Sequence, residues 1–470
     1  MTAGLQPHPP MSDEHHTLAA PDPRFLVAST VALPGAGPDP LAMAMATADG
    51  FVLLGRRGSV ATAGVAARLQ LPGGLRPDTS GAVARWLAAV PAIGPASQPG
   101  SGPLAVGALP FLPGQPTELL LPVVSVVSTA AGRSWMTVVR PATTGAGRAE
   151  DPTSPADLAA LLVAIGVSEG SDATVAVQTP RKAPADAAWA ATATVDAIWQ
   201  APDGPEFERR VTAALAAIAA GRIGKVVLAR QVHARFTHTL DPVSVLRRLQ
   251  EDEPTCAVFA HRQAGRVFLG ASPELLVRRR DDRVVSHPLA GTSAADDAAV
   301  AALVASGKEQ AEHRTVAEAV ADRLAAWCDE LQVPEAPTPV RLHGVAHLGT
   351  RITGRLHQPA ADALTLAAAL HPTPAVAGVP TGAALALITD LEDEGRGFYA
   401  GPVGWVDARG DGEMLVAIRS ATVAGNRAVA YGGAGIVAGS APDRELAETA
   451  AKLHTALGAL GIDAPAPSPV

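Results

Sequence analysis

The chain has 470 residues, of which 48% are hydrophobic but only 3% aromatic, and its formal net charge is −8. This length exceeds the roughly 250 to 300 residues at which a single core stops growing, so we expect two subdomains or one large multilayer unit with an aliphatic core. Lys and Arg are scattered along the sequence, which offers no continuous basic face to a phosphate backbone and makes nucleic acid an unexpected partner.

Several further classes of protein are excluded. Residues 1–23 lack the basic stretch followed by an apolar one that marks a signal peptide, and we interpret them as a disordered leader. No run of about 18 apolar residues is present, so no membrane-spanning helix is expected. The two cysteines, Cys256 and Cys328, are far apart and lack CxxC spacing, which argues against a disulfide framework and a zinc site. We therefore expect a cytoplasmic protein with no membrane partner.

The N-terminal portion, residues 24–195, has the pattern of antiparallel strands. Up to about residue 140, short apolar runs such as FVLLG and ELLLPVVSVVS are broken by Gly and Pro. The stretch GRRGSV at 55–60 has the glycines of a phosphate-binding loop but lacks the following Lys and Ser or Thr, so we predict a hairpin turn there. Segments rich in Pro, Ala and Gly at 143–158 and 179–190 are predicted to be connections.

The C-terminal portion, residues 196–470, alternates helices with strands. Apolar residues recur at helical spacing from Pro205 and stop at Gly221, and the strand KVVLARQV begins at Lys225 directly afterwards. Later strands include RVFLGAS, GPVGWVD and MLVAIRSATV, and later helices are expected near 297–332, 360–370, 380–391 and 442–460. These proportions predict an α+β fold in which large antiparallel β-sheets form a sandwich-like core with helices on the outer faces.

Two charged residues stand at the ends of apolar strands. Lys225 precedes the run VVLA and is either a solvated strand end or a buried base. Glu274 follows a proline in GASPELLVRR, where partial burial would raise its pKa and allow it to act as an acid. Alternatively, Glu274 pairs with one of the arginines at 278–280. The residues alone leave both alternatives open.

Two predicted helices carry acidic pairs with the same spacing, Glu309 with Glu312 and Glu445 with Glu448. Residues three apart share one helix face, so each pair presents two carboxylates in one direction. Such oxygen donors suit Mg²⁺, which accepts one or two carboxylates together with waters and an anionic ligand. The alternative is plain helix surface. A di-iron bundle is disfavoured because His313 stands four residues after Glu309, not three.

Arg419 interrupts the apolar strand MLVAIRSATV. Its guanidinium needs an anion, either a substrate carboxylate bound through two parallel hydrogen bonds or a carboxylate of the protein. The segment YGGAGIVAGS follows, and its glycines would let backbone N–H groups approach a ligand closely.

Ten short motifs occur in one order over about residues 205–460: KVVLAR, GASPE, HPLAGT, KEQAEH, HLGT, LHPTPAVAGVP, GFYAGPVGW, AIRSA, GGAGIV and ELAETAAKL. In these motifs the chain resembles the chorismate-utilising enzymes and, among them, the isochorismate synthases. The N-terminal portion is similar only through strands such as VGALPFLPG. One departure follows PLAGT, where many relatives have Arg-rich residues but this chain has SAADDAA, so contacts from that segment are not carried over.

The resemblance distinguishes two kinds of nucleophile. Family members that add water to chorismate carry Lys before VVLAR, as this chain does at Lys225, whereas the anthranilate and aminodeoxychorismate synthases, which add ammonia, generally do not. Ala290 stands where aminodeoxychorismate synthases have the Lys that forms a covalent intermediate. Both positions favour water. The run LHPTPAVAGVP is similar to the isochorismate synthase version of its loop, and a salicylate synthase, which releases salicylate and pyruvate, is the alternative.

The family mechanism implies roles for individual residues. Neutral Lys225 would remove a proton from the water that attacks C2 of chorismate, and Glu274 would protonate the departing C4 hydroxyl. Burial would have to lower the pKa of the lysine and raise that of the glutamic acid. The implied substrate-binding residues are Gly291, Thr292, His347, Tyr399, Arg419, Gly433, Gly435 and Lys452.

The resemblance also implies Mg²⁺ as cofactor, binding the ring carboxylate of chorismate. Its implied ligands are Glu312 and Glu448, supported by Glu309 and Glu445. No glutamine amidotransferase subunit is expected with water as nucleophile, and we expect a monomer. The pathway that uses the product, whether menaquinone, catecholate siderophore or salicylate, is not set by these residues. A non-catalytic carboxylate- or metal-binding protein on the same scaffold is a remote alternative, disfavoured by the joint presence of Lys225 and Glu274.

Overall fold

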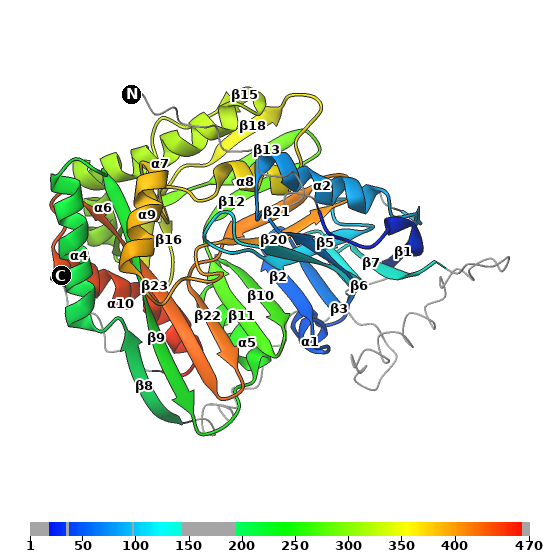
Figure 1. Ribbon diagram of the computed structural model, residues 1–470, viewed down its shortest axis with the longest axis horizontal. Helices are drawn as coiled ribbons and strands as arrows, with labels where there is room; N and C mark the ends of the chain where they lie inside the picture. Colours follow the sequence, from blue (N-terminus) through cyan, green and yellow to red (C-terminus); the bar gives the residue numbers. More distant parts are fainter. Residues whose placement is uncertain (1–17, 34–36, 96–97, 143–193, 463–470) are drawn as a thin grey trace, which may run out of the picture.

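The computed structural model describes residues 18–33, 37–95, 98–142 and 194–462 (Figure 1). Within these ranges a 20-stranded sheet and a 3-stranded sheet are present, with helices on the outside of the molecule. The predicted α+β class with large antiparallel sheets is therefore confirmed. The connections predicted at 143–158 and 179–190 lie outside the described residues.

The strands of the first portion are β1 (Leu26–Leu33), β2 (Gly50–Gly55), β3 (Gly58–Leu71), β4 (Ala92–Ile93), β5 (Leu104–Ala108), β6 (Thr117–Thr129) and β7 (Ser134–Pro141). Those that follow are β8 (Val195–Ala201), β9 (Lys225–Phe236), β10 (Ala257–Gln263), β11 (Arg266–Ser272), β12 (Leu275–Arg280), β13 (Arg283–His287), β14 (Leu289–Ala294), β15 (Cys328–Gln332), β16 (Thr338–Arg341), β17 (Val345–Gly349), β18 (Ile352–Leu356), β19 (Gly378–Val379), β20 (Pro402–Asp407), β21 (Gly412–Val416), β22 (Ser420–Ala424) and β23 (Arg427–Val437).

Strand pairing joins both predicted portions of the chain in one sheet. Neighbouring strands follow the order β4, β1, β7, β6, β3, β2, β10, β11, β22, β23, β9 and β8. A second branch leaves β6 through β5 and continues with β20, β21, β12, β13, β18 and β15. Because β2 pairs with β10 and β5 with β20, the predicted division after residue 195 does not separate two sheets. The smaller sheet has the order β14, β17, β16.

Helices cover the sheets and begin at recognisable caps. Asp203 caps the helix predicted after Pro205, accepting a hydrogen bond from the backbone N–H of Glu206 at 2.9 Å. In Figure 1, α4 and α10 lie beside β9 and β23, and α8 lies over β12 and β21. The described helices are α1 (Pro40–Met45), α2 (Pro77–Ala88), α4 (Gly204–Ala219), α5 (Pro242–Asp252), α6 (Asp297–Ala305), α7 (Gly307–Ala325), α8 (Ala363–Leu370), α9 (Thr381–Leu391) and α10 (Pro442–Ala459), with a 3-10 helix η2 at Pro23–Phe25.

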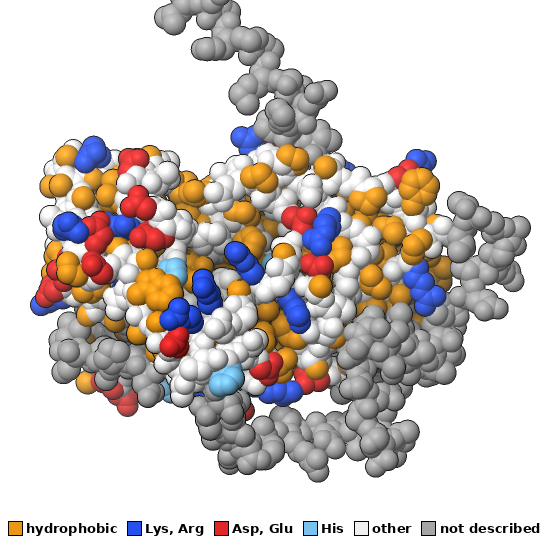
Figure 2. Space-filling view, turned by 60° about the horizontal axis from the view of Figure 1, so that its bottom comes forward, with side chains coloured by type: hydrophobic (Ala, Val, Ile, Leu, Met, Phe, Trp, Pro, Cys, Tyr) orange, Lys and Arg blue, Asp and Glu red, His pale blue; other side chains and the backbone are white. Residues whose placement is uncertain are grey.

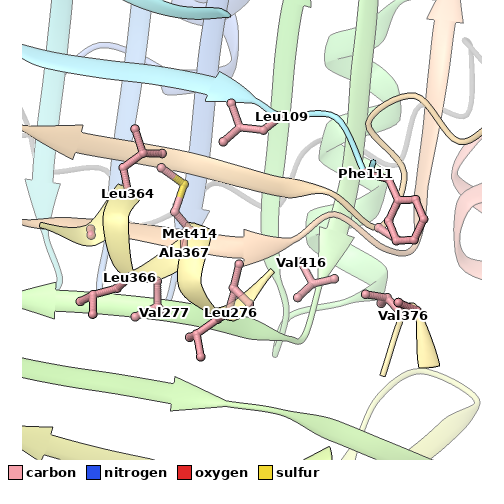
Figure 3. Packing of buried hydrophobic residues seen from close by; sticks show 14 of the residues in the cluster. Leu109, Phe111, Leu276, Val277, Leu364, Leu366, Ala367, Val376, Met414 and Val416 are labelled. Carbon is pink, nitrogen blue, oxygen red and sulfur yellow. The ribbon is translucent and has the colours of Figure 1, made fainter. Parts of the chain in front are cut away.

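The core is aliphatic, as the composition predicts. In Figure 3, Leu364 and Ala367 of α8 lie over Met414 of β21 and Val277 of β12, and all four side chains are buried. Full burial of an aliphatic side chain of this size stabilises the fold by about 2 kcal/mol. This packing fixes α8 on β21 and on β12, the strand that begins directly after Glu274.

The start of the described chain belongs to the fold. Ala19 pairs with Gln70 through backbone hydrogen bonds of 2.8 and 2.9 Å, and Nε1 of Trp86 donates to the carbonyl oxygen of Pro21. The prediction of a disordered leader was therefore wrong for residues 18–23, because these contacts hold the backbone. Residues 1–17 lie outside the described part of the chain.

Two predicted elements are broken in the structure. The helix expected near 297–332 is divided by Ser306, whose extended backbone caps α7 and whose hydroxyl accepts from the N–H of Glu309 at 3.3 Å. Its last residues, Cys328–Gln332, form β15 instead, because they pair with β18. The strand MLVAIRSATV is interrupted at Arg419, which has a φ of 53° and separates β21 from β22.

The hairpin predicted at 55–60 is present, since Gly55 pairs with Gly58 where β2 turns into β3. The two cysteines are free thiols. On the face shown in Figure 2, Lys and Arg side chains are interspersed with Asp and Glu side chains. No described helix is long and apolar enough to cross a membrane.

Candidate active site

One cavity of about 970 Å³, including the solvent at its mouth, is lined by every residue that the sequence predicted to be catalytic, substrate-binding or metal-binding. It lies where β9 and β23 face α7, α10 and the segment between β11 and β12. The residues predicted to be catalytic, substrate-binding or metal-binding that line it are Lys225, Glu274, Gly291, Thr292, Glu309, Glu312, His347, Tyr399, Arg419, Gly433, Gly435, Glu445, Glu448 and Lys452.

Lys225 is buried. It is the first residue of β9, only 4% of its surface is exposed, and its Nζ donates to Oε1 of Glu312 on α7 at 2.7 Å. The interpretation as a solvated strand end was therefore wrong. The chain delivers the lysine into the cavity because α4 ends just before it and β9 is paired on both sides, with β23 and with β19.

The glycines of β23 make room for the side chains of the site. A Cβ atom on Gly435 would lie 3.1 Å from Cε of Lys225 and 3.2 Å from Oε1 of Glu312. A Cβ on Gly433 would lie 3.0 Å from the hydroxyl oxygen of Tyr399. Both residues are paired with β9. The structure thus gives these glycines a steric reason in addition to the ligand contact that the sequence predicted.

Glu274 is held without a charged partner. Its carboxyl is buried, with 3% of the residue exposed, and Oε1 has no hydrogen-bond partner. The alternative of pairing with an arginine at 278–280 is wrong, since no ion pair joins Glu274 to them among the described residues, and Arg278 and Arg279 pair with Glu413 and Asp411 instead. Burial raises the pKa of Glu274 to about 8, and the N–H of Leu289 and the charge of Lys225 offset only part of that effect. The side chain is therefore protonated at neutral pH.

The backbone around Glu274 is fixed from two sides. Its N–H donates to Oγ of Ser272 at 3.2 Å, and that hydroxyl donates to the carbonyl oxygen of Val416 at 2.6 Å. The N–H of Val416 in turn donates to the carbonyl oxygen of Glu274 at 3.1 Å. The backbone of the acid is thus tied to the end of β21.

The two acidic pairs face each other from α7 and α10. Burial and the charge of Glu312 raise the pKa of Glu309, and burial raises the pKa of Glu445 to about 7 with a further contribution from Glu448. Burial alone would raise the pKa of Glu312 as well, but the adjacent Lys225 lowers it overall. Plain helix surface is therefore the wrong interpretation for these side chains, because their carboxylates repel one another inside a cavity.

The carboxylates fit a divalent cation on two observations. Oε2 of Glu445 is buried without a hydrogen-bond partner, and like-charge repulsion contributes to the raised pKa values of both Glu309 and Glu445. No three His, Cys, Asp or Glu side chains in the described ranges already stand in an arrangement that could hold a metal ion. Mg²⁺ does not need such a closed set, since it is commonly held by one or two carboxylates, waters and an anionic ligand.

Two lysines form ion pairs with two of the four carboxylates in the structure. Lys225 pairs with Glu312 at 2.7 Å, and Nζ of Lys452 pairs with Oε1 of Glu448 at 2.5 Å. These are the two glutamates implied as direct metal ligands. A cation that binds both glutamates would use their second oxygens or displace the ammonium groups.

Arg419 carries a free positive charge into the cavity. It is 5% exposed, and its described hydrogen bonds go to Nε2 of His347 at 2.9 Å and to the carbonyl oxygen of Lys452 at 3.4 Å. No described carboxylate forms an ion pair with it, so its charge is available to an anion in the cavity. Burial and the nearby Arg419 lower the pKa of His347 to about 3, so the imidazole is neutral.

Two stacked tyrosines form the aromatic wall. The rings of Tyr399 and Tyr431 are 5.3 Å apart and nearly parallel, at 12°. Burial raises the pKa of Tyr399 to about 12, so its hydroxyl remains a donor. Tyr431 belongs to the segment YGGAGIV but was not predicted as a site residue.

Two other cations at the cavity were missed. Lys308 directly precedes Glu309 and lines the cavity at the start of α7. Arg396 pairs with Glu392 at 2.6 Å and donates to the carbonyl oxygens of Val227 and Val376. A signal for Lys308 was present in KEQAEH, whereas nothing in GRGFYAG indicated that Arg396 would be buried.

Comparison with known proteins agrees with this geometry. The model of the chorismate binding enzyme family matches residues 55–461. The chain belongs to the chorismate binding enzyme family. The match includes all the cavity residues named above and most of the first portion, where the sequence resemblance was loose.

Members of the family similar to this chain include named isochorismate synthases. Isochorismate synthase DhbC of Bacillus subtilis is 42% identical over 275 residues, which cover 56% of this chain and 69% of that protein. Putative isochorismate synthase MenF of Mycobacterium tuberculosis is 46% identical over 258 residues, covering 52% and 69%. The solved structure of MenF, the menaquinone-specific isochorismate synthase of Escherichia coli, superimposes with a TM-score of 0.72 at 25% identity, covering 94% of this chain and 95% of that one.

Proposed function

We propose that the protein is an isochorismate synthase, which converts chorismate to isochorismate by adding water at C2 and expelling the C4 hydroxyl. The observation that carries the proposal is that one cavity holds both a buried lysine and a buried, protonated carboxyl. Lys225 and Glu274 are both almost fully buried there, and the Coulomb field of the lysine acts on the acid. The similarity to named isochorismate synthases supports the same reaction.

Substrate binding follows from the positive charge of the cavity. Chorismate carries two carboxylates, and Arg419 offers a guanidinium that no described carboxylate of the protein neutralises. We assign the enolpyruvyl carboxylate of chorismate to Arg419, and the hydroxyl of Tyr399 can donate a hydrogen bond to that carboxylate as well. Gly433 leaves the space in which that hydroxyl lies, because any side chain there would meet it.

Proton transfer needs one acceptor and one donor. Lys225, once its ammonium group has lost a proton, would take a proton from the water as the water oxygen bonds to C2, and both ring double bonds shift toward C4. The carboxyl of Glu274 would donate its proton to the C4 oxygen as that bond breaks, so the hydroxyl leaves as water. One proton is thus taken up and one is released within the site. Each transfer is a general acid–base step, and such a step contributes about 10²- to 10⁴-fold to the reaction rate.

Mg²⁺ is part of the proposal, with Glu312 and Glu448 as ligands and Glu309 and Glu445 in support. When bound, the ion would offset the charge of the ring carboxylate and orient it. The protein's own contribution is the set of four carboxylates whose mutual repulsion a cation relieves. A cytoplasmic monomer without an amidotransferase subunit completes the proposal, since water needs no second active site.

The test is a product assay. Purified protein incubated with chorismate and Mg²⁺ is expected to form isochorismate, detected by chromatography, and to form little salicylate or pyruvate. Salicylate together with pyruvate would identify a salicylate synthase instead. Consumption of no chorismate at all would contradict both and favour a binding protein on the same scaffold.

A further inference from the structure

The edge of β9 opposite β23 has a gap between two neighbouring strands. On that edge β19 pairs with Lys225 and Val226, and β8 pairs from Gln231 onward. Among the described strands, none pairs with Val227 or Ala229 on this side. Buried backbone N–H and C=O groups need hydrogen-bond partners, so other parts of the chain have to fill the gap.

Two charged side chains fill it. Nη2 of Arg396 donates to the carbonyl oxygen of Val227 at 2.7 Å, and Oε1 of Glu392 accepts from the N–H of Ala229 at 2.8 Å. The same Nη2 and Oε1 atoms are joined to each other at 2.6 Å, and both side chains are buried. A neighbouring strand would present a donor and an acceptor side by side in this way, so the ion pair takes the place of a strand here.

The same arginine reaches two other walls of the substrate cavity. Its Nη1 donates to the carbonyl oxygen of Val376 at 2.8 Å, and its own carbonyl oxygen accepts from the N–H of Tyr399 at 2.9 Å. Its guanidinium also lies over the ring of Phe111, 4.2 Å from the ring centre. Val227, Val376 and Tyr399 all line the cavity. Arg396 therefore joins three of its walls.

The guanidinium of Arg396 is already engaged by the protein. Nε donates to Oε2 of Glu392 at 2.7 Å, and together with the bonds of Nη1 and Nη2 this engages four of its N–H groups. Arg419, in contrast, has no described carboxylate as a partner. A buried ion pair adds little net stability compared with apolar side chains of similar size, so the fixed geometry is its main contribution.

We propose that the Arg396–Glu392 pair is a positioning unit for substrate binding. It holds Val376 and Tyr399 against β9 at the separation that the substrate requires. The inference rests on the proposed function for the identity of that substrate, chorismate. Lys225 is held independently of the pair, through its strand pairing with β19 and β23. Loosening the pair should therefore weaken chorismate binding more than it slows turnover.

Two matched substitutions test the proposal. Arg396→Lys keeps a positive charge beside Glu392 but lacks the planar fork, so a single ammonium group cannot hold both backbone carbonyls in the same geometry. Truncation to Ala is avoided because it would leave a buried carboxylate without a partner. The control is Arg210→Lys, the same change in a buried arginine that pairs with Glu206 and Glu394 outside the cavity.

Amide hydrogen exchange on the ligand-free protein tests the positioning without any substrate. In Arg396→Lys, peptides that contain Ala229 and Tyr399 should exchange about tenfold faster than in the wild type, because their N–H groups lose fixed acceptors. In Arg210→Lys these peptides should exchange at the wild-type rate. Unchanged exchange in Arg396→Lys, or an equal increase in the control, would overturn the proposal.

Steady-state kinetics test the consequence for binding. KM for chorismate should rise about tenfold in Arg396→Lys with kcat within about threefold of the wild type, while Arg210→Lys should keep both within about twofold. A fall in kcat at unchanged KM, or an equal rise in KM in both variants, would overturn the proposal. Wild-type protein that converts no chorismate would contradict the proposed function instead, and hydrogen exchange would then decide whether the pair positions Tyr399.

Discussion

Nη2 of Arg419 lies 2.9 Å from Nε2 of His347, and Nδ1 of the same ring lies 2.8 Å from the carbonyl oxygen of Gly291. The guanidinium can only donate and the carbonyl can only accept, so the ring carries its proton on Nδ1 and is neutral. His347 was predicted to bind substrate. His347 lines the cavity and also holds the guanidinium of Arg419, while its contact with substrate stays a prediction.

Replacing His347 with Leu should therefore raise KM for chorismate by about 10- to 100-fold, the range for losing a hydrogen bond to a charged group, with a smaller effect on kcat. His347→Gln can still accept from Arg419 and should recover most of the affinity. Steady-state kinetics of both variants measure this. A fall in kcat with unchanged KM in His347→Leu would show that the ring acts on the chemistry and not on Arg419.

Lys225→Gln should abolish turnover, with kcat reduced by about 10²- to 10⁴-fold, because an amide can donate to Glu312 but cannot take a proton. The matched control is Lys452→Gln, which makes the same change in the other lysine–glutamate pair and should raise KM with kcat within about tenfold of the wild type. Chromatographic measurement of isochorismate formation compares the two. Equal losses of kcat in both variants would remove the special role of Lys225.

Glu274→Gln should be inactive yet more stable than the wild type at high pH. The folded pKa of Glu274 is about 8, above its ordinary value of 4.5. The protonated carboxyl therefore stabilises the folded state fully below pH 4.5, and this stabilisation is lost as pH rises through the folded pKa. Glutamine is neutral throughout and avoids the cost of a buried charge. Denaturant unfolding should show the variant gaining on the order of 2 kcal/mol relative to the wild type between pH 6 and pH 9. No change in the stability difference over this range would mean that the pKa is not raised.

The acidity of Glu274 also sets the pH dependence of catalysis. Activity should fall as pH rises through about 8, because the carboxyl loses the proton that it must donate. The alkaline limb of kcat/KM against pH reports this. A profile that stays level to pH 9.5 would exclude Glu274 as the acid.

Mg²⁺ should compete with lysine for the carboxylates. In Lys452→Met, Glu448 has no ammonium partner, so the metal-free variant should melt at a lower temperature than the wild type and gain more from added Mg²⁺. At a hundredfold excess over Kd, binding stabilises the folded state by about 2.7 kcal/mol. Thermal unfolding in EDTA and in Mg²⁺ measures both values, and Glu445→Gln should show a reduced gain. An identical shift in all three proteins would place the ion elsewhere.

The sequence predicted which residues line the site better than it predicted the contacts between them. Motif order named Lys225, Glu274 and the four glutamates, and all of them line one cavity. The contact of Lys225 with Glu312 joins residues 87 positions apart and depends on how α7 sits over β9, which no local pattern reports.

Fold predictions failed where tertiary contacts overrode local pattern. Residues 328–332 read as the end of a helix because the apolar spacing continues, but β18 offers an open edge and they pair with it. Arg419 reads as the interior of a strand, yet its backbone adopts a positive φ that separates β21 from β22. Helices with strong caps, such as the one that begins after Asp203, were located correctly because their signals are local.

The pairing of β5 with β20 has a consequence for how the chain acquires its structure. Val106 lies beside Trp405, and the ribosome adds Val106 to the chain long before Trp405. Contacts of such long sequence separation slow folding, because the intervening chain must be ordered before they form. Until β20 emerges from the ribosome, β5 presents an apolar edge to other chains. We therefore expect slow refolding and a need for chaperone assistance, with the catalytic cavity closing only after α10 has been synthesised.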